Sequence, residues 1–407
     1  MFFRRNFAGA ALPRDHAQQQ RQRTILSFTF SLLLIEFFDE LVFGVREAAW
    51  PLIRDDLGLS YTEVGMLLSV PVIFGNLVEP WLGILADVWK RRVLVLGGGI
   101  VFAVALALVS LSYGFAALLV AFVLFNPASG AFVSLSQATL MDSAPERREQ
   151  NMARWTLSGS LGNVFGTLAI GGALVVGLGW RWLFAGMVVF TLLLLALVWR
   201  APFPAAAPVE QEIKTSFRLG LRNALSALRR RDVVRWLILL EFGDLTWDVM
   251  RGFLALYFVD VVKTSEAEAA FAVLVWTLIG LPGDFLLLPL LERVRGLSYL
   301  RWSTTATLVL FPAFLLASDF RVKLILLGLL GFANAGWYAI LKAQLYTSMP
   351  GQSGTAMMLG NVFGFVSSFV PLALGLFAQT YGLSNMMWLL IIGPAVLLLG
   401  ITVRIAD

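Results

Sequence analysis

Residues 161–166 read Leu161-Gly162-Asn163-Val164-Phe165-Gly166, and the same six residues recur at positions 359–364. Other matches follow when the second half of the chain is aligned 205 residues behind the first, with seven residues missing from the second half before position 359. Glu36-Phe37-Phe38-Asp39 then matches Glu241-Phe242-Gly243-Asp244. The remaining matched pairs are Arg46 and Arg251, Asp55 and Asp260, Ser60 and Ser265, Glu63 and Glu268, Glu79 and Asp284, Asp87 and Glu292, and Pro145 and Pro350. A colinear series of this length indicates two copies of one structural unit.

The composition is that of a membrane protein. Of the 407 residues, 58% are hydrophobic and 14% are charged, and the mean hydropathy is +0.80. A soluble domain has about 25% charged residues, so this chain cannot cover a water-exposed surface and is not expected to be a soluble enzyme. Repeated apolar runs of about 20 residues predict transmembrane helices, whereas the alternating pattern of a membrane barrel is absent.

The predicted fold is an all-α polytopic membrane protein with 12 transmembrane helices in two pseudo-symmetric six-helix bundles. The duplication predicts that the two bundles pack around an axis along the membrane normal. The expected spans are 25–49, 62–86, 92–112, 115–141, 155–177, 180–199, 236–259, 268–291, 298–317, 321–347, 355–378 and 385–404.

Lysine and arginine set the expected orientation. With both termini in the cytoplasm, cytoplasmic segments hold 23 of the 31 Lys and Arg residues and external segments hold five. Because basic residues favour cytoplasmic loops, we expect a multi-pass inner-membrane protein with both termini inside. The expected divisions are a cytoplasmic segment 1–24 without a cleavable signal, a bundle 25–199, a cytoplasmic linker 200–235 with an amphipathic helix, and a bundle 236–407.

Several kinds of chemistry are excluded by residue types. The chain has no cysteine, which excludes disulfides and thiolate metal sites, and its one histidine, His16, lies outside the predicted spans. No nucleophile and base set is therefore expected in the bundles, and neither an enzyme nor a cofactor is predicted. The glycine-rich run 97–99 is not followed by Gly-Lys-Ser/Thr, so it is not a phosphate loop. No ATP-binding machinery is therefore predicted in this chain.

A signature between the second and third predicted spans resembles that of the major facilitator superfamily. It reads Gly83-Ile84-Leu85-Ala86-Asp87-Val88-Trp89-Lys90-Arg91-Arg92, and it keeps the glycine, the aspartate and the final basic pair of the family pattern. Val88 and Lys90 replace the usual arginine and glycine. The resemblance implies alternating access, with Asp87, Lys90, Arg91 and Arg92 forming a cytoplasmic latch against the second half. The alternative is that these charges only mark the membrane boundary.

The weaker copy of this signature is Glu292-Arg293-Val294-Arg295. Two patterns of common drug and proton antiporters are missing, since span 115–141 has no arginine and residues 166–172 have no proline. A looser likeness is to fosmidomycin-resistance-like exporters. It rests on Asp39, on the turn from Pro51-Leu52 to Glu63-Val64-Gly65, and on Asn126-Pro127-Ala128-Ser129.

Charged residues inside the spans are the candidate functional residues. A charge at mid-bilayer costs about 2.5–3.5 kcal/mol even on lenient scales, so these groups must face the interior, pair, or be neutral. At about 100° per residue, Glu36, Asp39, Glu40 and Arg46 lie within an arc of about 120° on span 25–49. Glu241, Asp244, Asp248 and Arg251 form a matching stripe on span 236–259. We expect the two stripes to face each other across a central cavity.

Burying several acids together favours the neutral form of some of them, which makes them candidates to carry protons. Arg46 and Arg251 would neutralise carboxylates or bind an anionic group of the substrate. The alternative is structural, in which Asp39 pairs with Arg46 and Asp244 pairs with Arg251. Six acids against two arginines leave an excess of four, which such static pairing does not explain.

Four further residues are candidates by position. The duplicated acids Glu79 and Asp284 lie two turns from the cytoplasmic boundary, where they would serve as a gate-side proton site or have a structural role. Lys342, in span 321–347, is expected in the cavity, paired with a central acid. Asn126 precedes Pro127, which interrupts the backbone hydrogen bonds of span 115–141 near mid-membrane; the alternative is a plain kink.

These observations predict a proton-coupled secondary active transporter, favoured as an exporter of a small cationic or amphipathic organic molecule. The expected partners are a small-molecule or ion substrate, protons and the lipid bilayer, with no nucleic acid and a monomeric state. One alternative is a divalent metal cation transporter, in which Glu36, Asp39, Glu241 and Asp244 would supply oxygen ligands. Further alternatives are a lipid or lysolipid flippase and a non-transporting sensor or scaffold.

Overall fold

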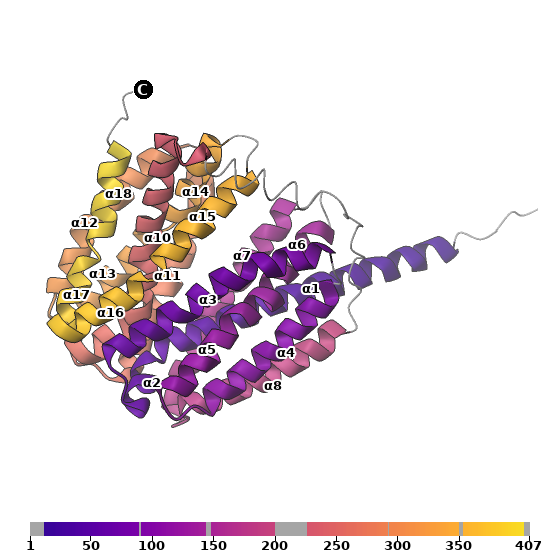
Figure 1. The fold of residues 1–407 in the computed structure, drawn as a ribbon, viewed down its shortest axis with the longest axis horizontal. Helices are drawn as coiled ribbons and strands as arrows, with labels where there is room; N and C mark the ends of the chain where they lie inside the picture. The colour runs from indigo at the N-terminus through magenta and orange to yellow at the C-terminus, as the bar shows by residue number, and fades with distance from the viewer. Residues whose placement is uncertain are drawn as a thin grey trace, which may run out of the picture.

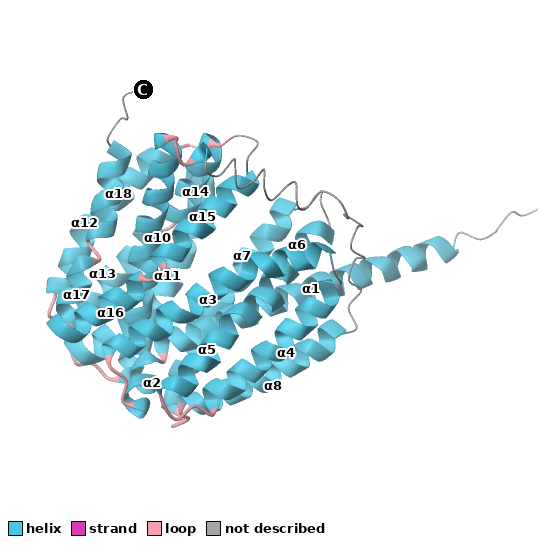
Figure 2. Cartoon of the chain, viewed as in Figure 1, coloured by secondary structure: helices cyan, strands magenta, loops and turns pink. Residues whose placement is uncertain are grey.

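The computed structural model describes residues 12–88, 91–143, 148–199, 226–291, 293–349 and 353–402. These residues form helices joined by short turns, with no strand among them (Figures 1 and 2). The two halves of the chain form two helical bundles, as the internal repeat predicts. Of the expected linker 200–235 with its amphipathic helix, residues 200–225 lie outside the described residues, and the helix α10 already begins at Arg231.

Within the described residues, the first bundle contains eight α-helices and one short π-helix. The bounds are α1 Leu12–Ala48, α2 Trp50–Leu57, α3 Tyr61–Val88, α4 Arg91–Ser110, α5 Phe115–Ser129, η1 Gly130–Ser134, α6 Leu135–Ser143, α7 Arg148–Val175 and α8 Trp180–Trp199. The π-helix follows Pro127, which has no backbone N–H to donate, so the predicted interruption of this span is accommodated without breaking the helix.

The second bundle repeats this arrangement. Its elements are α10 Arg231–Tyr257, η3 Phe258–Val262, α11 Glu266–Leu291, α12 Gly296–Leu316, α13 Phe320–Ala333, α14 Trp337–Ser348, α15 Ser353–Ser367, α16 Val370–Tyr381, α17 Leu383–Leu389 and α18 Ile392–Thr402. Each of the 12 expected spans corresponds to one of these helices or to helices in series. The sequence did not predict α2, which follows directly on α1.

Nine helices or helix pairs in the described part of the chain are long and apolar enough to cross a membrane. The expected spans 25–49, 236–259 and 298–317 are not among these nine, because their helices are not apolar enough. In α1 and α10 the reason is the charged stripe, because each carries more acids and bases than an ordinary span holds. In α12 the reason is a first half rich in serine and threonine.

A capping box begins the second span of each bundle, and it is the same in both. The backbone N–H of Ser60 donates to the Glu63 carboxylate at 2.8 Å, and that of Ser265 donates to Glu268 at 2.9 Å. Each serine hydroxyl in turn accepts from the backbone N–H of its glutamate, at 3.2 and 3.3 Å. Such boxes satisfy N–H groups that the first turn of a helix leaves free, so the second span begins in the same way in both sequence copies.

Glycines allow α1 and α7 to pack with their backbones in contact. A Cβ at Gly162 would lie 2.1 Å from the carbonyl oxygen of Phe37, and one at Gly166 would lie 2.2 Å from that of Leu41. The duplicated glycines in α15, Gly360 and Gly364, have open space in place of such contacts. The repeated six-residue motif therefore closes a helix interface in the first bundle and leaves one open in the second.

The two bundles meet at one end of the molecule, where α3 crosses α16. A Cβ at Gly65 would lie 2.7 Å from the carbonyl oxygen of Pro371, and one at Gly375 would lie 2.6 Å from that of Tyr61. The Ser69 hydroxyl also accepts a hydrogen bond of 2.9 Å from the backbone N–H of Leu372. In Figure 1 the bundles lie together near α2 and α16 and separate toward the ends of α6 and α15.

Candidate functional site

A cavity of about 540 Å³ lies between the two bundles. It is lined by α1 and α3 of the first bundle and by α10, α14, α15 and the start of α16 of the second. Eight charged side chains reach it: Glu40, Arg46, Glu47, Glu241, Asp244, Asp248, Arg251 and Lys342. We call this cavity the first chamber.

The regular spacing of the α10 residues places them all at the first chamber. Glu241, Asp244, Asp248 and Arg251 are separated by three, four and three residues, which puts them on one face of a helix. Asp248 is exposed, and it is exposed to the chamber. The expected stripe of span 236–259 therefore lies along one wall of a cavity that the other bundle completes.

The opposite wall comes from α1, and only part of its expected stripe lines the cavities. With Glu36 at 0°, residues 40, 43 and 47 lie within about 40° of it at 100° per residue, whereas Asp39 and Arg46 lie about 60–80° to one side. The long Arg46 side chain still reaches the first chamber, but the short Asp39 side chain reaches neither cavity.

Asp39 instead lies inside the first bundle. It is 6% exposed and accepts a hydrogen bond of 2.9 Å from the Ser129 hydroxyl of α5. Glu79 of α3 packs nearby against Gly130, where an added Cβ would lie 2.8 Å from its carboxylate. Asn126 packs beside Gly75 of α3 and likewise lines neither cavity. These residues join α1, α3 and α5 within one bundle.

A second chamber of about 390 Å³ lies on the other side of α1 and α10, between α7 and α11. Glu36 lines it and is 9% exposed. Its carboxylate packs against Gly159 of α7, where an added Cβ would lie only 2.6 Å from the carboxylate oxygen. Glu40 and Arg251 line both chambers, so α1 and α10 divide one central space into two parts at these residues.

Glu47 of α1 and Arg251 of α10 form an ion pair between the bundles, with Nε and Oε2 3.7 Å apart. The Glu47 side chain is 7% exposed, and neither atom has a hydrogen bond to another described residue. The pairs considered as the structural alternative, Asp39 with Arg46 and Asp244 with Arg251, are not among the ion pairs within 4 Å of the described residues.

Two other charged residues of the first chamber have neutral partners. Glu241 accepts a hydrogen bond from Ser367 of α15. Lys342 donates to the Tyr338 hydroxyl one turn away, and its Nζ lies 4.5 Å from the centre of that ring. No ion pair joins Lys342 to an acid in the part of the chain described. The acids of α10 that line this chamber are therefore not neutralised by fixed ion pairs within their own bundle.

The expected latch falls largely on residues that the structure does not describe. Lys90 and Glu292 lie outside the described residues, as do the side chains of Asp87 and Asp284. Arg91 has a partner within the structure. Arg92 donates to the carbonyl oxygen of Trp199 in α8, which belongs to its own bundle. In the conformation seen here, Arg92 thus contacts the first half of the chain.

Metal coordination has no support in this cavity. No group of three or more His, Cys, Asp or Glu side chains is arranged to hold a metal ion among the described residues. The acids that line the first chamber face one another across open space.

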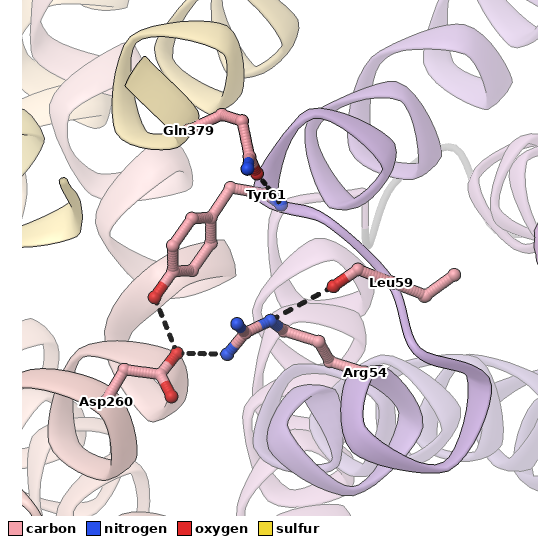
Figure 3. A network of polar contacts seen from close by, with 5 residues as sticks. All are labelled: Arg54, Leu59, Tyr61, Asp260 and Gln379. Carbon is pink, nitrogen blue, oxygen red and sulfur yellow. Dashed lines mark hydrogen bonds and ion pairs between the residues drawn. The ribbon is translucent and has the colours of Figure 1, made fainter. Parts of the chain in front are cut away.

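A polar network that the sequence did not predict closes the end where the bundles meet (Figure 3). Arg54 and the Tyr61 hydroxyl both bind one carboxylate oxygen of Asp260, the tyrosine at 2.7 Å. The backbone N–H of Tyr61 donates to the Gln379 side chain at 2.9 Å, and the Arg54 guanidinium lies 4.4 Å from the centre of the Tyr61 ring. We call Arg54, Tyr61, Asp260 and Gln379 the end lock.

The chain matches the family model described as the Major Facilitator Superfamily over residues 32–371. The match covers most of both bundles. The chain belongs to the Major Facilitator Superfamily. It is therefore a multi-pass membrane transporter by family and fold, and not an enzyme.

One curated relative and several solved structures are similar to this chain. The multidrug efflux pump SdrM of Staphylococcus aureus (strain N315) is 24% identical over 190 residues, which span 45% of this chain and 41% of that protein. The chain thus matches less than half the length of this relative.

Three solved structures share the fold along most of their length. A bacterial homolog of the human lysosomal transporter Spinster, inward-facing and unoccupied, has a TM-score of 0.71 and 17% identity over 97% of this chain and 98% of its own. The nucleoside transporter NupG has a TM-score of 0.72 and 14% identity, with coverages of 92% and 97%. The D-xylose-proton symporter has a TM-score of 0.73 and 14% identity, with coverages of 92% and 96%.

Proposed function

We propose that this superfamily member is a proton-coupled secondary transporter that exports a small cationic or amphipathic organic molecule. The observation that carries the proposal is the first chamber, which acids from both bundles line together. Its five acids are Glu40, Glu47, Glu241, Asp244 and Asp248, against the three bases Arg46, Arg251 and Lys342.

The excess of acids gives a physical basis for coupling. Removing charges from water is costly unless each is paired, so a chamber with more acids than bases is most stable when protons or a cation neutralise the excess. A cationic substrate and protons then compete for the same carboxylates. Binding of one favours release of the other, and this competition defines an exchange of substrate for protons.

The end lock supports export as the direction of transport. We assign it to the external side, because the count of basic residues places both termini in the cytoplasm. Arg54 and Asp260 belong to different bundles, so this contact must break if the chamber is to open outward. The conformation seen here would then be the one that faces the cytoplasm, where an exporter loads its substrate.

Export of an amphipathic cation also agrees with the similarity of part of this chain to SdrM, a multidrug efflux pump. Proton coupling agrees with the shared fold of the D-xylose-proton symporter. Neither protein assigns a substrate to this chain. The charges of the chamber are what favour a cation.

Transport by the purified protein in liposomes tests this function. We expect an imposed pH gradient to drive ethidium, an amphipathic cation, across the membrane in exchange for protons. Four variants that keep side-chain size and remove one acid each are Glu36→Gln, Asp39→Asn, Glu241→Gln and Asp244→Asn. We expect the two α10 variants to lower pH-driven transport at least tenfold. Asp39→Asn should have a smaller effect, because Asp39 lines neither chamber.

The matched control is Asp232→Asn, which removes an acid from the first turn of α10, where it pairs with Arg230 at the surface. Its transport should equal that of the wild type. The proposal is wrong if all four acid variants keep full pH-driven transport, or if the wild type moves ethidium at a rate that does not depend on the pH gradient.

A further inference from the structure

The two duplicated arginines of the first chamber have different surroundings. Arg251 forms the ion pair with Glu47 of the other bundle. Arg46 has no ion pair or hydrogen bond with any described residue, and its buried Nε atom is without a partner. The sequence copies are equivalent at these positions, so the structure alone separates a paired arginine from an unpaired one.

Aromatic rings hold the Arg46 guanidinium in place. Its central carbon lies 4.4 Å from the centre of the Phe43 ring and 5.8 Å from that of Phe122. Rings that contact the face of a guanidinium stabilise its charge but accept no N–H hydrogen bonds, so its edge stays available to a planar anion. Arg46 lines the first chamber, where such an anion can reach it.

Three of the chamber acids lie apart from the two arginines along the length of the chamber. On α1, Arg46 lies six residues beyond Glu40, which is about 9 Å along the helix axis. On α10, Glu241 and Asp244 are the acids farthest from Arg251, at ten and seven residues, or about 15 and 10 Å. The two arginines thus lie toward the end lock. Glu241, which accepts a hydrogen bond from Ser367, and Asp244, which lines the chamber together with Lys342, lie toward the other end.

Acids near Arg46 do not replace an anionic ligand. Glu47 is its neighbour in sequence but pairs with Arg251, and Asp39 is engaged with Ser129. Glu40 lies one and a half turns away and lines both chambers. Arg46 thus lines the chamber without an ion pair, and an anionic group of a ligand could form charge-assisted hydrogen bonds with its guanidinium.

We propose that Arg46 binds the anionic group of the transported molecule and that the substrate is a zwitterion. This inference rests on the proposed function and adds a second recognition element to it. The carboxylate of the substrate binds the free edge of Arg46, and its cationic group lies among Glu241, Asp244 and Asp248. A volume of about 540 Å³ is within the range of about 300–1,000 Å³ of drug-sized ligand sites.

A pair of dyes that differ only in one carboxylate tests the proposal. Rhodamine B is a zwitterion at neutral pH, and its methyl ester is a cation of nearly the same size. Fluorescence anisotropy with the purified protein in detergent gives the dissociation constant of each dye. We expect the wild type to bind the free acid at least tenfold more tightly than the ester.

Variants separate the two recognition elements. Arg46→Gln should weaken binding of the free acid and leave the affinity for the ester unchanged, so the ratio of the two dissociation constants should come close to one. An unchanged affinity for the ester also shows that the site is folded. Arg46→Lys should retain part of the preference. Asp244→Asn should weaken both dyes alike, and Arg92→Gln, an arginine remote from the chamber, should change neither.

The proposal is overturned if the wild type shows a ratio of one or less, including no detectable binding of either dye, or if Arg46→Gln leaves the ratio unchanged. This result is distinct from failure of the proposed function. That function fails when the acid variants retain full pH-driven ethidium transport, an assay in which the substrate carries no carboxylate.

Discussion

Glu36 and Gly159 show how one missing side chain positions a charged group. The Glu36 carboxylate occupies the space where a Cβ of residue 159 would be, with its oxygen 2.6 Å from that position. Only glycine leaves this space free. The contact places the carboxylate at the edge of the second chamber, which is also lined by Trp155 and Thr156 of α7, the helix that contains Gly159.

Gly159→Ala is therefore expected to displace the Glu36 carboxylate without changing any charge. Because the displaced atoms are the end of a flexible side chain, we expect a small loss of stability, of about 1 kcal/mol or less, but a several-fold fall in pH-driven ethidium transport. Gly171→Ala on the same helix is the matched control, since nothing lies within 4 Å of its added Cβ.

Thermal unfolding in detergent and transport in liposomes measure the two effects separately. Equal transport rates for Gly159→Ala and Gly171→Ala would show that the position of Glu36 does not matter for function.

At the scale of helices, the repeated six-residue motif has two different roles. In α7 its glycines contact the backbone of α1, whereas in α15 the same glycines border the first chamber. Close backbone contact of this kind is a common way for membrane helices to associate, because small residues allow tight packing.

This difference predicts opposite results for equivalent substitutions. Gly162→Ala and Gly166→Ala should destabilise the protein, because a Cβ would meet fixed carbonyl oxygens at 2.1 and 2.2 Å. Overpacking typically costs about 1–3 kcal/mol, and the melting temperature in detergent should fall by several degrees. Gly360→Ala and Gly364→Ala should leave it nearly unchanged, since each added methyl group enters open space. A similar loss for both pairs would contradict the open interface at α15.

Much of the helical structure could be predicted from the sequence. The apolar runs predicted the helices, and the repeat predicted two equivalent bundles, because hydropathy and capping residues such as Ser60 and Ser265 act locally. The place of Asp39 could not be predicted, because helical periodicity gives an angle around one helix and not the neighbour at that angle. The structure shows that the neighbour is Ser129 of α5.

At the scale of the whole molecule, the end lock joins the two bundles. Arg54 and Asp260 are 206 positions apart, and the sequence alignment pairs Asp260 with Asp55 rather than with Arg54. Repeat matching identifies equivalent positions in two copies, but it says nothing about contacts between the copies. The network could therefore be found only once the bundles were placed relative to each other.

Weakening the end lock should shift the balance between conformations. Asp260→Asn removes the charge that binds Arg54 and keeps the size of the side chain. A partly exposed ion pair contributes about 0.2–1 kcal/mol, so the population opened at this end should rise by up to several-fold. Tyr61→Phe removes one hydrogen bond and keeps the ion pair, so its effect should be smaller.

Spin-label distances measure this shift, because the chain has no cysteine and two can be introduced cleanly. Labels at the exposed positions Asp55→Cys and Tyr381→Cys report the separation of the bundles at this end. A distance distribution that is the same with and without Asp260→Asn would show that the network does not hold the end closed.

The claim on which the account depends is that acids of both bundles exchange protons for a cation in one shared chamber. The most direct measurement is the number of protons released when ethidium binds to the purified protein in weakly buffered detergent solution, followed with a pH indicator. The account predicts about one proton or more per cation for the wild type near neutral pH, and a clear loss of this release in the Glu241→Gln and Asp244→Asn double variant. Binding without proton release in the wild type, or undiminished release in the double variant, would contradict it.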